Sequence, residues 1–100
     1  MAKLFIKDAH LKELTDIFKK YCPNAEIWAY GSRVSGDAHN GSDLDLAVKN
    51  LGNTAINIYE LKEIIKESNI PFLVDIFEFD ELPESFKKKI GAKYVVIYKA

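Results

Sequence analysis

The two segments GSRVSG (residues 31–36) and SDLDL (residues 42–46) decide the fold that this sequence predicts. Before them, Ala25–Tyr30 (AEIWAY) is apolar and aromatic, as expected for a buried strand that leads into a turn. Gly31 can adopt a positive φ or approach a ligand closely, and Ser32 is placed to start a short helix. The free backbone N–H groups at the start of a helix, together with the positive end of its dipole, attract phosphate. The sequence therefore predicts a strand, a phosphate-binding turn and a short helix.

An Asp-x-Asp pair follows on what the sequence predicts to be the next strand. Asp43 and Asp45 are two positions apart, so both carboxylates project from one face while Leu44 and Leu46 face the other. Mg²⁺ prefers carboxylates, water and phosphate oxygens as ligands. Two carboxylates beside a phosphate-binding turn therefore indicate a site for a magnesium-bound nucleotide.

The rest of the sequence predicts an alternation of helices and strands. An apolar stripe at helical spacing follows Asp8, which is a candidate helix cap, and Pro23 ends that helix. Pro83 suits the first turn of a short helix that Gly91 would end. The predicted segments are helices over residues 8–21, 54–68 and 83–91, and strands over residues 72–78 and 93–98.

The strand–helix–strand passage from Asp43 to Phe77 is long enough for a crossover that places two strands side by side in one sheet. The second of these strands contains Asp75 among apolar residues, where an unpaired carboxylate is costly. Asp75 either lies on the exposed face of an edge strand, or pairs with a cation such as Arg33, or joins the other two carboxylates in one site.

Composition limits the class of protein. One hundred residues, 48% hydrophobic and 29% charged, predict one globular domain with a modest core. A net charge of −1 argues against general nucleic-acid binding. The single cysteine, Cys22, cannot form an internal disulfide and is expected to fill the core, which fits a cytoplasmic protein. The sequence contains no apolar stretch of membrane-spanning length, so no membrane association is expected.

The spacing of Gly-Ser, ten residues and Asp-x-Asp resembles the signature of the nucleotidyltransferase superfamily that includes DNA polymerase β. The sequence GSRVSG…SDLDLAV is similar to that of the smallest branch of this superfamily, the minimal nucleotidyltransferases encoded beside a helical HEPN-domain protein. The strands WAY, PFLVDI and YVVIY also fit that branch, so the resemblance covers nearly the whole chain. It implies an α/β (α+β) nucleotidyltransferase fold, with a small mixed sheet of about four strands flanked by helices, as one domain over residues 1–100.

The resemblance also implies the residues that carry the chemistry. Asp43, Asp45 and Asp75 would be the catalytic carboxylates and would hold two Mg²⁺ ions, with Asp75 as a metal ligand, a base or both. Three acids that share a site repel one another and raise their pKa values unless divalent cations neutralise them. A site of this kind would therefore depend on metal.

Four residues are the expected nucleotide-binding set. Gly31 and Ser32 would hold the β- and γ-phosphates of ATP, the expected donor, through backbone N–H groups and the Ser32 hydroxyl. Arg33 either adds a charge-assisted contact to these phosphates or forms only a surface salt bridge. Ser42 would cap or orient the backbone of Asp43.

The implied function is Mg²⁺-dependent transfer of AMP from ATP to an acceptor hydroxyl, a tyrosine of a HEPN-type toxin, which makes this chain an antitoxin. The chain is expected to end where the shared core does and so to need its HEPN partner, or a second copy of itself, to complete a complex. Two alternatives remain open. The chain either binds nucleotide and neutralises its partner by steric contact alone, or modifies a small molecule such as an aminoglycoside beside a helical substrate-binding chain.

Overall fold

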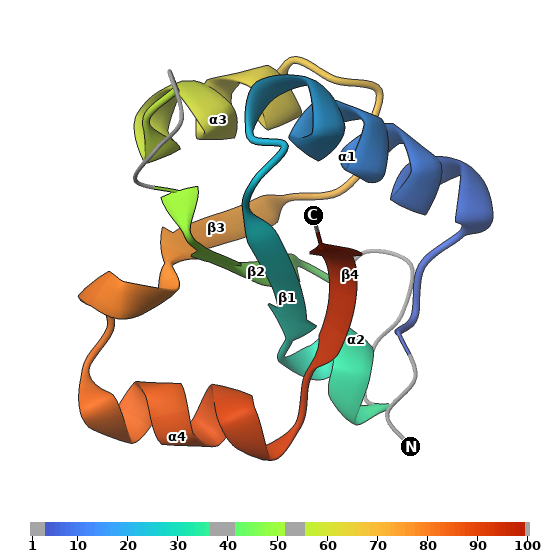
Figure 1. Ribbon diagram of the computed structural model, residues 1–100. Coiled ribbons are helices and arrows are strands. Elements are labelled where there is room, and N and C mark those ends of the chain that lie inside the picture. The colour runs from blue at the N-terminus through green and yellow to red at the C-terminus, as the bar shows by residue number, and fades with distance from the viewer. Residues whose placement is uncertain (1–3, 37–41, 52–55, 100) are drawn as a thin grey trace.

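The computed structural model describes residues 4–36, 42–51 and 56–99, which form one four-stranded sheet with helices on both faces (Figure 1). In chain order the elements are α1 (Asp8–Tyr21), β1 (Glu26–Tyr30), α2 (Ser32–Ser35), β2 (Leu44–Lys49), α3 (Ile58–Lys66), β3 (Val74–Glu78), the 3-10 turn η2 (Phe79–Glu81), α4 (Glu84–Ala92) and β4 (Val95–Lys99). The strand order is β3-β2-β1-β4, with β2 and β3 parallel and β1 antiparallel to both its neighbours. The predicted α+β fold with a mixed four-stranded sheet is confirmed.

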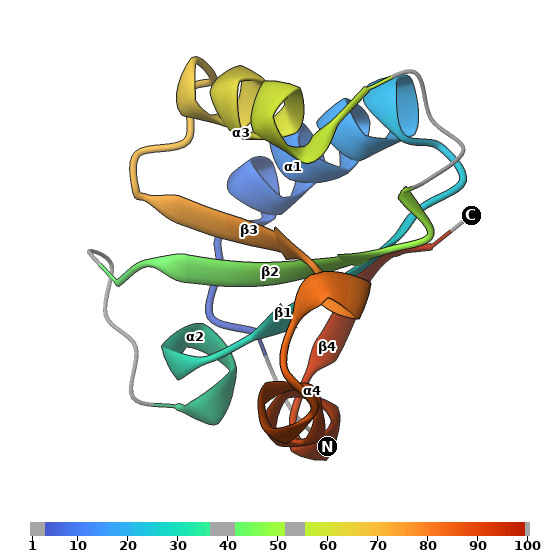
Figure 2. The same ribbon diagram turned by 90° about the vertical axis from the view of Figure 1, so that its left-hand side faces the viewer.

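The main hydrophobic core lies between the sheet and the helices α1 and α3, which cover the same face (Figure 2). Leu14 and Phe18 of α1 and Leu61 of α3 are completely buried, as the apolar stripes of these helices require. Cys22 is buried in the same core, which confirms that it fills the core. None of the described helices is both long and apolar enough to cross a membrane.

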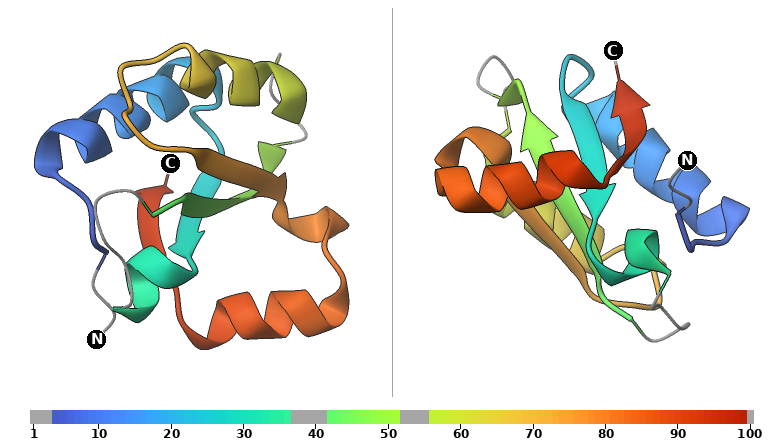
Figure 3. Two further views of the ribbon diagram at one scale, coloured as in Figure 1. Left: turned by 180° about the vertical axis from the view of Figure 1, so that it is seen from behind. Right: turned by 90° about the horizontal axis from the view of Figure 1, so that it is seen from below.

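The opposite face of the sheet is covered only in part, by α4 and the chain around η2 (Figure 3). Ile90 of α4 is buried there with Tyr30 and Ala47. Trp28 stacks on Tyr94 at 3.9 Å between ring centroids and widens this second cluster.

The predicted start of the third helix is wrong. α3 begins at Ile58, and Asn57 is its N-cap. The Asn57 side chain accepts a hydrogen bond from the Glu60 backbone N–H at 2.9 Å and donates one to the Glu60 carboxylate at 2.7 Å. This reciprocal pair resembles a capping box and fixes the start of the helix. Residue 54, where the prediction began the helix, lies outside the described residues.

Several other predicted boundaries also shift. Gly91 does not end α4, which continues to Ala92, and Pro83 is the N-cap of that helix rather than part of its first turn. Asp8 is the first residue of α1 and not its cap, a position that Lys7 holds. The outer strands begin later than predicted, with β3 at residue 74 and β4 at residue 95, and Asp43 lies one residue before β2.

Candidate active site

The sheet places two of the predicted catalytic carboxylates side by side. β3 runs parallel to β2 in a register that pairs Asp45 with Asp75. On the other side of β2, Tyr30 of β1 pairs with Asp45. Leu44 and Ile76, the neighbours of these acids in sequence, are buried in the main core. Because strand residues alternate between faces, Asp45 and Asp75 point to the opposite face, the side of α4.

Asp45 lies in the electrostatic field of the two other carboxylates. The pKa of Asp45 is raised, chiefly by its partial burial and then by the negative charges of Asp75 and Asp43. The pKa of Tyr30 is raised to about 12 by burial and, secondarily, by Asp45 and Asp75. This end of the sheet therefore carries a concentrated negative potential in the absence of a cation.

The glycine-serine turn lies directly against this acidic group. Gly31 has φ 80° and ψ −154°, a backbone conformation that is essentially restricted to glycine. A Cβ atom at Gly31 would overlap Oδ2 of Asp45, so a side chain at this position would displace that carboxylate. Ser32 begins α2 directly after this contact, as the sequence predicted, and Gly36 is the C-cap of α2 with φ 97°. The turn predicted to bind phosphate thus touches a carboxylate predicted to bind metal.

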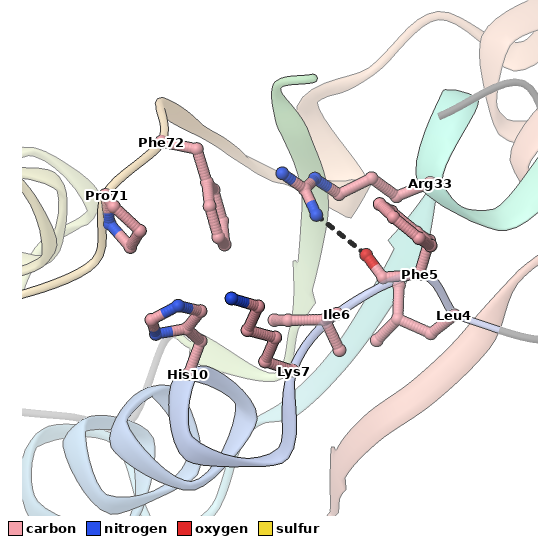
Figure 4. A pocket seen from close by; sticks show the side chains of 8 residues that line it. All are labelled: Leu4, Phe5, Ile6, Lys7, His10, Arg33, Pro71 and Phe72. Atoms are coloured by element: carbon pink, nitrogen blue, oxygen red, sulfur yellow. Dashed lines mark hydrogen bonds between the residues drawn. The ribbon is translucent and has the colours of Figure 1, made fainter. Parts of the chain in front are cut away.

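Arg33, in α2, is buried with only 2% of its surface exposed. Figure 4 shows its guanidinium among residues of the N-terminal segment and of the chain before β3. Nε donates to the Ser42 carbonyl at 2.9 Å and Nη1 donates to the Phe5 carbonyl at 2.7 Å. The guanidinium also lies 4.0 Å from the centroid of the Phe72 ring. Arg33 therefore ties the N-terminal segment to the start of β2, next to Asp43.

The charge of Arg33 reaches the acidic group. Burial lowers the pKa of Arg33, and the nearby carboxylate of Asp43 acts in the opposite direction. Arg33 also lines a cavity of about 430 Å³ together with Leu4, Phe5, Ile6, Lys7, His10, Pro71 and Phe72 (Figure 4). The surface salt bridge considered as its alternative role does not match this burial, and its phosphate contact stays a prediction.

The carboxylate donors suit magnesium, although the described residues do not form a complete set of metal ligands. Among residues 4–36, 42–51 and 56–99, no three His, Cys, Asp or Glu side chains are already arranged to hold a metal ion. The donors at this end of the sheet are carboxylate oxygens, which Mg²⁺ prefers. Burial chiefly, and then the charges of Asp75 and Asp43, already raise the pKa of Asp45. A divalent cation would remove that repulsion, so the residues fit the predicted ion in chemistry and charge.

The family follows from this geometry and from comparison with known proteins. Residues 12–100 match the family described as "Polymerase beta, Nucleotidyltransferase". The chain belongs to this nucleotidyltransferase family. This chain is a minimal member of the family. The "Probable protein adenylyltransferase MntA" of Haemophilus influenzae is 36% identical to it over 99 residues, which span 96% of this chain and 85% of that relative.

A solved structure shows the same nucleotidyltransferase fold. It is described as "Crystal structure of the toxin-antitoxin with AMP-PNP" and has a TM-score of 0.72 to this chain. The match covers 90% of this chain and 73% of that one, at 20% sequence identity.

Two features of this nucleotidyltransferase site were missed from the sequence. Tyr30 lies beside Asp45, and the signal for this was available, because an antiparallel pair joined through the turn puts the end of one strand opposite the start of the next. The burial of Arg33 could not be predicted from a local pattern, because its hydrogen-bond partners are the backbone carbonyls of Phe5 and Ser42, which are distant in the sequence.

Proposed function

We propose that this nucleotidyltransferase transfers AMP from ATP to a hydroxyl group of a protein acceptor, with Asp43, Asp45 and Asp75 as its catalytic carboxylates. The observation that supports this most strongly is the position of Asp45. It is paired with Asp75 on one side and in contact with Gly31 on the other. Asp45 therefore belongs to the acidic pair and also contacts the turn that is predicted to bind phosphate. This arrangement suits a nucleotide, whose phosphates must be bound and whose negative charge must be neutralised.

The proposed reaction is a displacement at the α-phosphorus of ATP. The acceptor oxygen forms a bond to the α-phosphorus, the bond from that phosphorus to the bridging oxygen breaks, and pyrophosphate leaves. The hydroxyl proton passes to Asp75, the outermost of the three acids along the strand order. Bound Mg²⁺, for which we propose two ions held by the three carboxylates, would neutralise the charge that builds on the phosphates.

The nucleotide-binding residues have distinct parts in this proposal. Gly31 and Ser32 hold the β- and γ-phosphates through backbone N–H groups and the Ser32 hydroxyl. Arg33 and Ser42 support this contact, because the bond from Arg33 Nε to the Ser42 carbonyl fixes the chain next to Asp43. The buried charge of Arg33 also contributes to the potential that the phosphates meet.

The proposed acceptor is a tyrosine of a HEPN-type toxin, so that this chain is its antitoxin. The name of the relative, a probable protein adenylyltransferase, supports a protein acceptor, and a fold shared with a toxin–antitoxin structure holding AMP-PNP supports the pairing. In this proposal residues 1–100 form one catalytic domain that works in the cytoplasm, in a complex with the toxin or with a second copy of itself.

The test is to incubate the chain, Mg²⁺ and the HEPN protein of the neighbouring gene with ATP labelled at the α-phosphate, and separately at the γ-phosphate. Transfer of AMP predicts that the toxin acquires the α-label and not the γ-label, and that the Asp43→Asn/Asp45→Asn variant gives no label. Transfer of the γ-label would identify a kinase instead. Neutralisation of the toxin by the unlabelled double variant would favour steric inhibition and contradict the proposal.

A further inference from the structure

An exposed apolar row surrounds Asp75 on the outer strand of the sheet. β3 is an edge strand, and within the described residues its outer side pairs with no other strand. Leu73 is 60% exposed and Phe77 is 41% exposed, although both are large and apolar. They lie two positions before and after Asp75, and side chains at this spacing share one face of a strand. The acid that the proposed function assigns to the acceptor thus lies between two exposed apolar side chains.

The same edge borders a groove that reaches Asp75. The groove has a volume of about 580 Å³ and lies between α3 and the chain leading into β3, with Lys62, Lys66, Leu73, Val74 and Asp75 among its lining residues. At the far end of the strand, the Lys62 ammonium lies 5.2 Å from the Phe77 ring centroid and so joins α3 to the exposed row. Scattered exposed apolar residues are ordinary, but these two flank the proposed catalytic acid and border the groove, which makes this edge a candidate binding surface.

The backbone of β3 is also available for pairing. The Leu73 carbonyl accepts a hydrogen bond from the Leu44 N–H at 2.9 Å and so points toward β2. Because successive peptide groups of a strand point to opposite sides, those of the next residue, Val74, and of Ile76 point outward, away from β2. An open edge of this kind accepts an extended peptide as an additional strand.

The direction of approach follows from the order of the strands. Gly31, which contacts Asp45 in the proposed phosphate site, is on the inner side of β2, next to β1. Asp75 is on the outer side, on β3. With the nucleotide held from the inner side, the outer edge remains for the second substrate.

We propose that an extended segment of the acceptor protein docks along the outer edge of β3 as an added strand, with its hydroxyl residue opposite Asp75. This inference rests on the proposed function. Directly opposed residues on neighbouring strands share a face, so the segment's residues two positions before and after the hydroxyl would lie against Leu73 and Phe77. The acceptor segment is therefore expected to carry apolar side chains at positions −2 and +2 from its tyrosine.

The test uses two synthetic peptides of identical composition, KTTLTYTLTTK and KTTTLYLTTTK. The first places leucines two positions from the tyrosine and the second places them one position away, on the opposite face of a strand. Each peptide is incubated with the chain, Mg²⁺ and α-labelled ATP. Docking along β3 predicts at least about fivefold more label on the first peptide, from two favourable cross-strand contacts.

Two variants assign the preference to this edge. In Leu73→Ser/Phe77→Ser the preference between the peptides should disappear, while Val96→Ser, a matched change of a 43% exposed residue on the other edge strand, should keep it. Calorimetric titration with MgATP on the same samples separates this inference from the proposed function. Equal label on the two peptides, or none on either, with MgATP binding intact would overturn docking along β3 and leave the nucleotide site standing. Absence of MgATP binding by the wild-type chain would instead overturn the proposed function.

Discussion

Replacing Gly31 with alanine is expected to damage the fold and the nucleotide site together. The added methyl group meets two obstacles. The backbone at Gly31 has φ 80° and ψ −154°, and the Cβ atom would overlap Oδ2 of Asp45. The carboxylate of Asp45 would have to move away from the position in which the turn and β2 hold it.

Two other glycines make it possible to separate these effects. Gly36 also has a positive φ of 97°, but its Cβ would meet no atom within 4 Å, so Gly36→Ala carries backbone strain alone, about 1–2 kcal/mol. Gly91 lies inside α4 with the same open space, and Gly91→Ala should stabilise the chain by about 0.5–1 kcal/mol. For Gly31→Ala the backbone conformation alone costs about 1–3 kcal/mol, and the displacement of Asp45 adds to it.

Urea unfolding of the three variants and the wild-type chain, each with a MgATP titration, measures both effects. The free energy of unfolding should rise in Gly91→Ala, fall in Gly36→Ala and fall further in Gly31→Ala. MgATP affinity should drop at least about tenfold, or about 1.4 kcal/mol, only in Gly31→Ala. If Gly31→Ala bound MgATP as tightly as Gly36→Ala does, the contact between the turn and Asp45 would have no part in binding.

Three further predictions concern the groups around this site. Arg33→Met should lower the free energy of unfolding by about 2–3 kcal/mol in urea titrations, because the carbonyls of Phe5 and Ser42 lose a charged donor; wild-type stability would show that these bonds contribute nothing. The pKa of Asp45 is higher in the folded chain than its unfolded value of 3.8. The protonated Asp45 carboxyl therefore contributes stability that is fully present below pH 3.8 and is lost as pH rises through the folded pKa, where the group becomes charged. Asp45→Asn should therefore raise the metal-free free energy of unfolding at pH 7, with a gain that shrinks below about pH 4, and an unchanged gain at low pH would refute this cause. Burial raises the pKa of Cys22 to about 11, so iodoacetamide at pH 8 should alkylate it at least about 100-fold more slowly in the folded chain than in urea, and equal rates would contradict its burial.

Much of the fold could be predicted from the sequence because its signals are local. The helix from Asp8 to Tyr21 was predicted apart from its cap, which is Lys7 and not Asp8, since its apolar stripe and the proline that follows it act within a few residues. The crossover between the two strands is long enough to place them side by side, as predicted, but the register that pairs Asp45 with Asp75 comes from the structure. Gly91 misled the prediction because glycine is frequent just after helices, whereas here it lies within α4.

Other features depend on contacts that a local pattern does not contain. The burial of Arg33 results from carbonyls 28 and 9 residues away and from an aromatic ring just before β3. The exposure of Leu73 and Phe77 depends on the position of β3 at the edge of the sheet, which the strand order decides. The roles of the three carboxylates remain predictions.

The most direct test of the proposed site is a calorimetric titration of ATP into the purified chain with and without Mg²⁺, in parallel with the Asp43→Asn/Asp45→Asn variant. The proposed site predicts that binding requires both the metal and the two carboxylates. Equal binding of MgATP by the wild-type chain and the double variant would contradict it, because the nucleotide would then be held somewhere other than at this acidic end of the sheet.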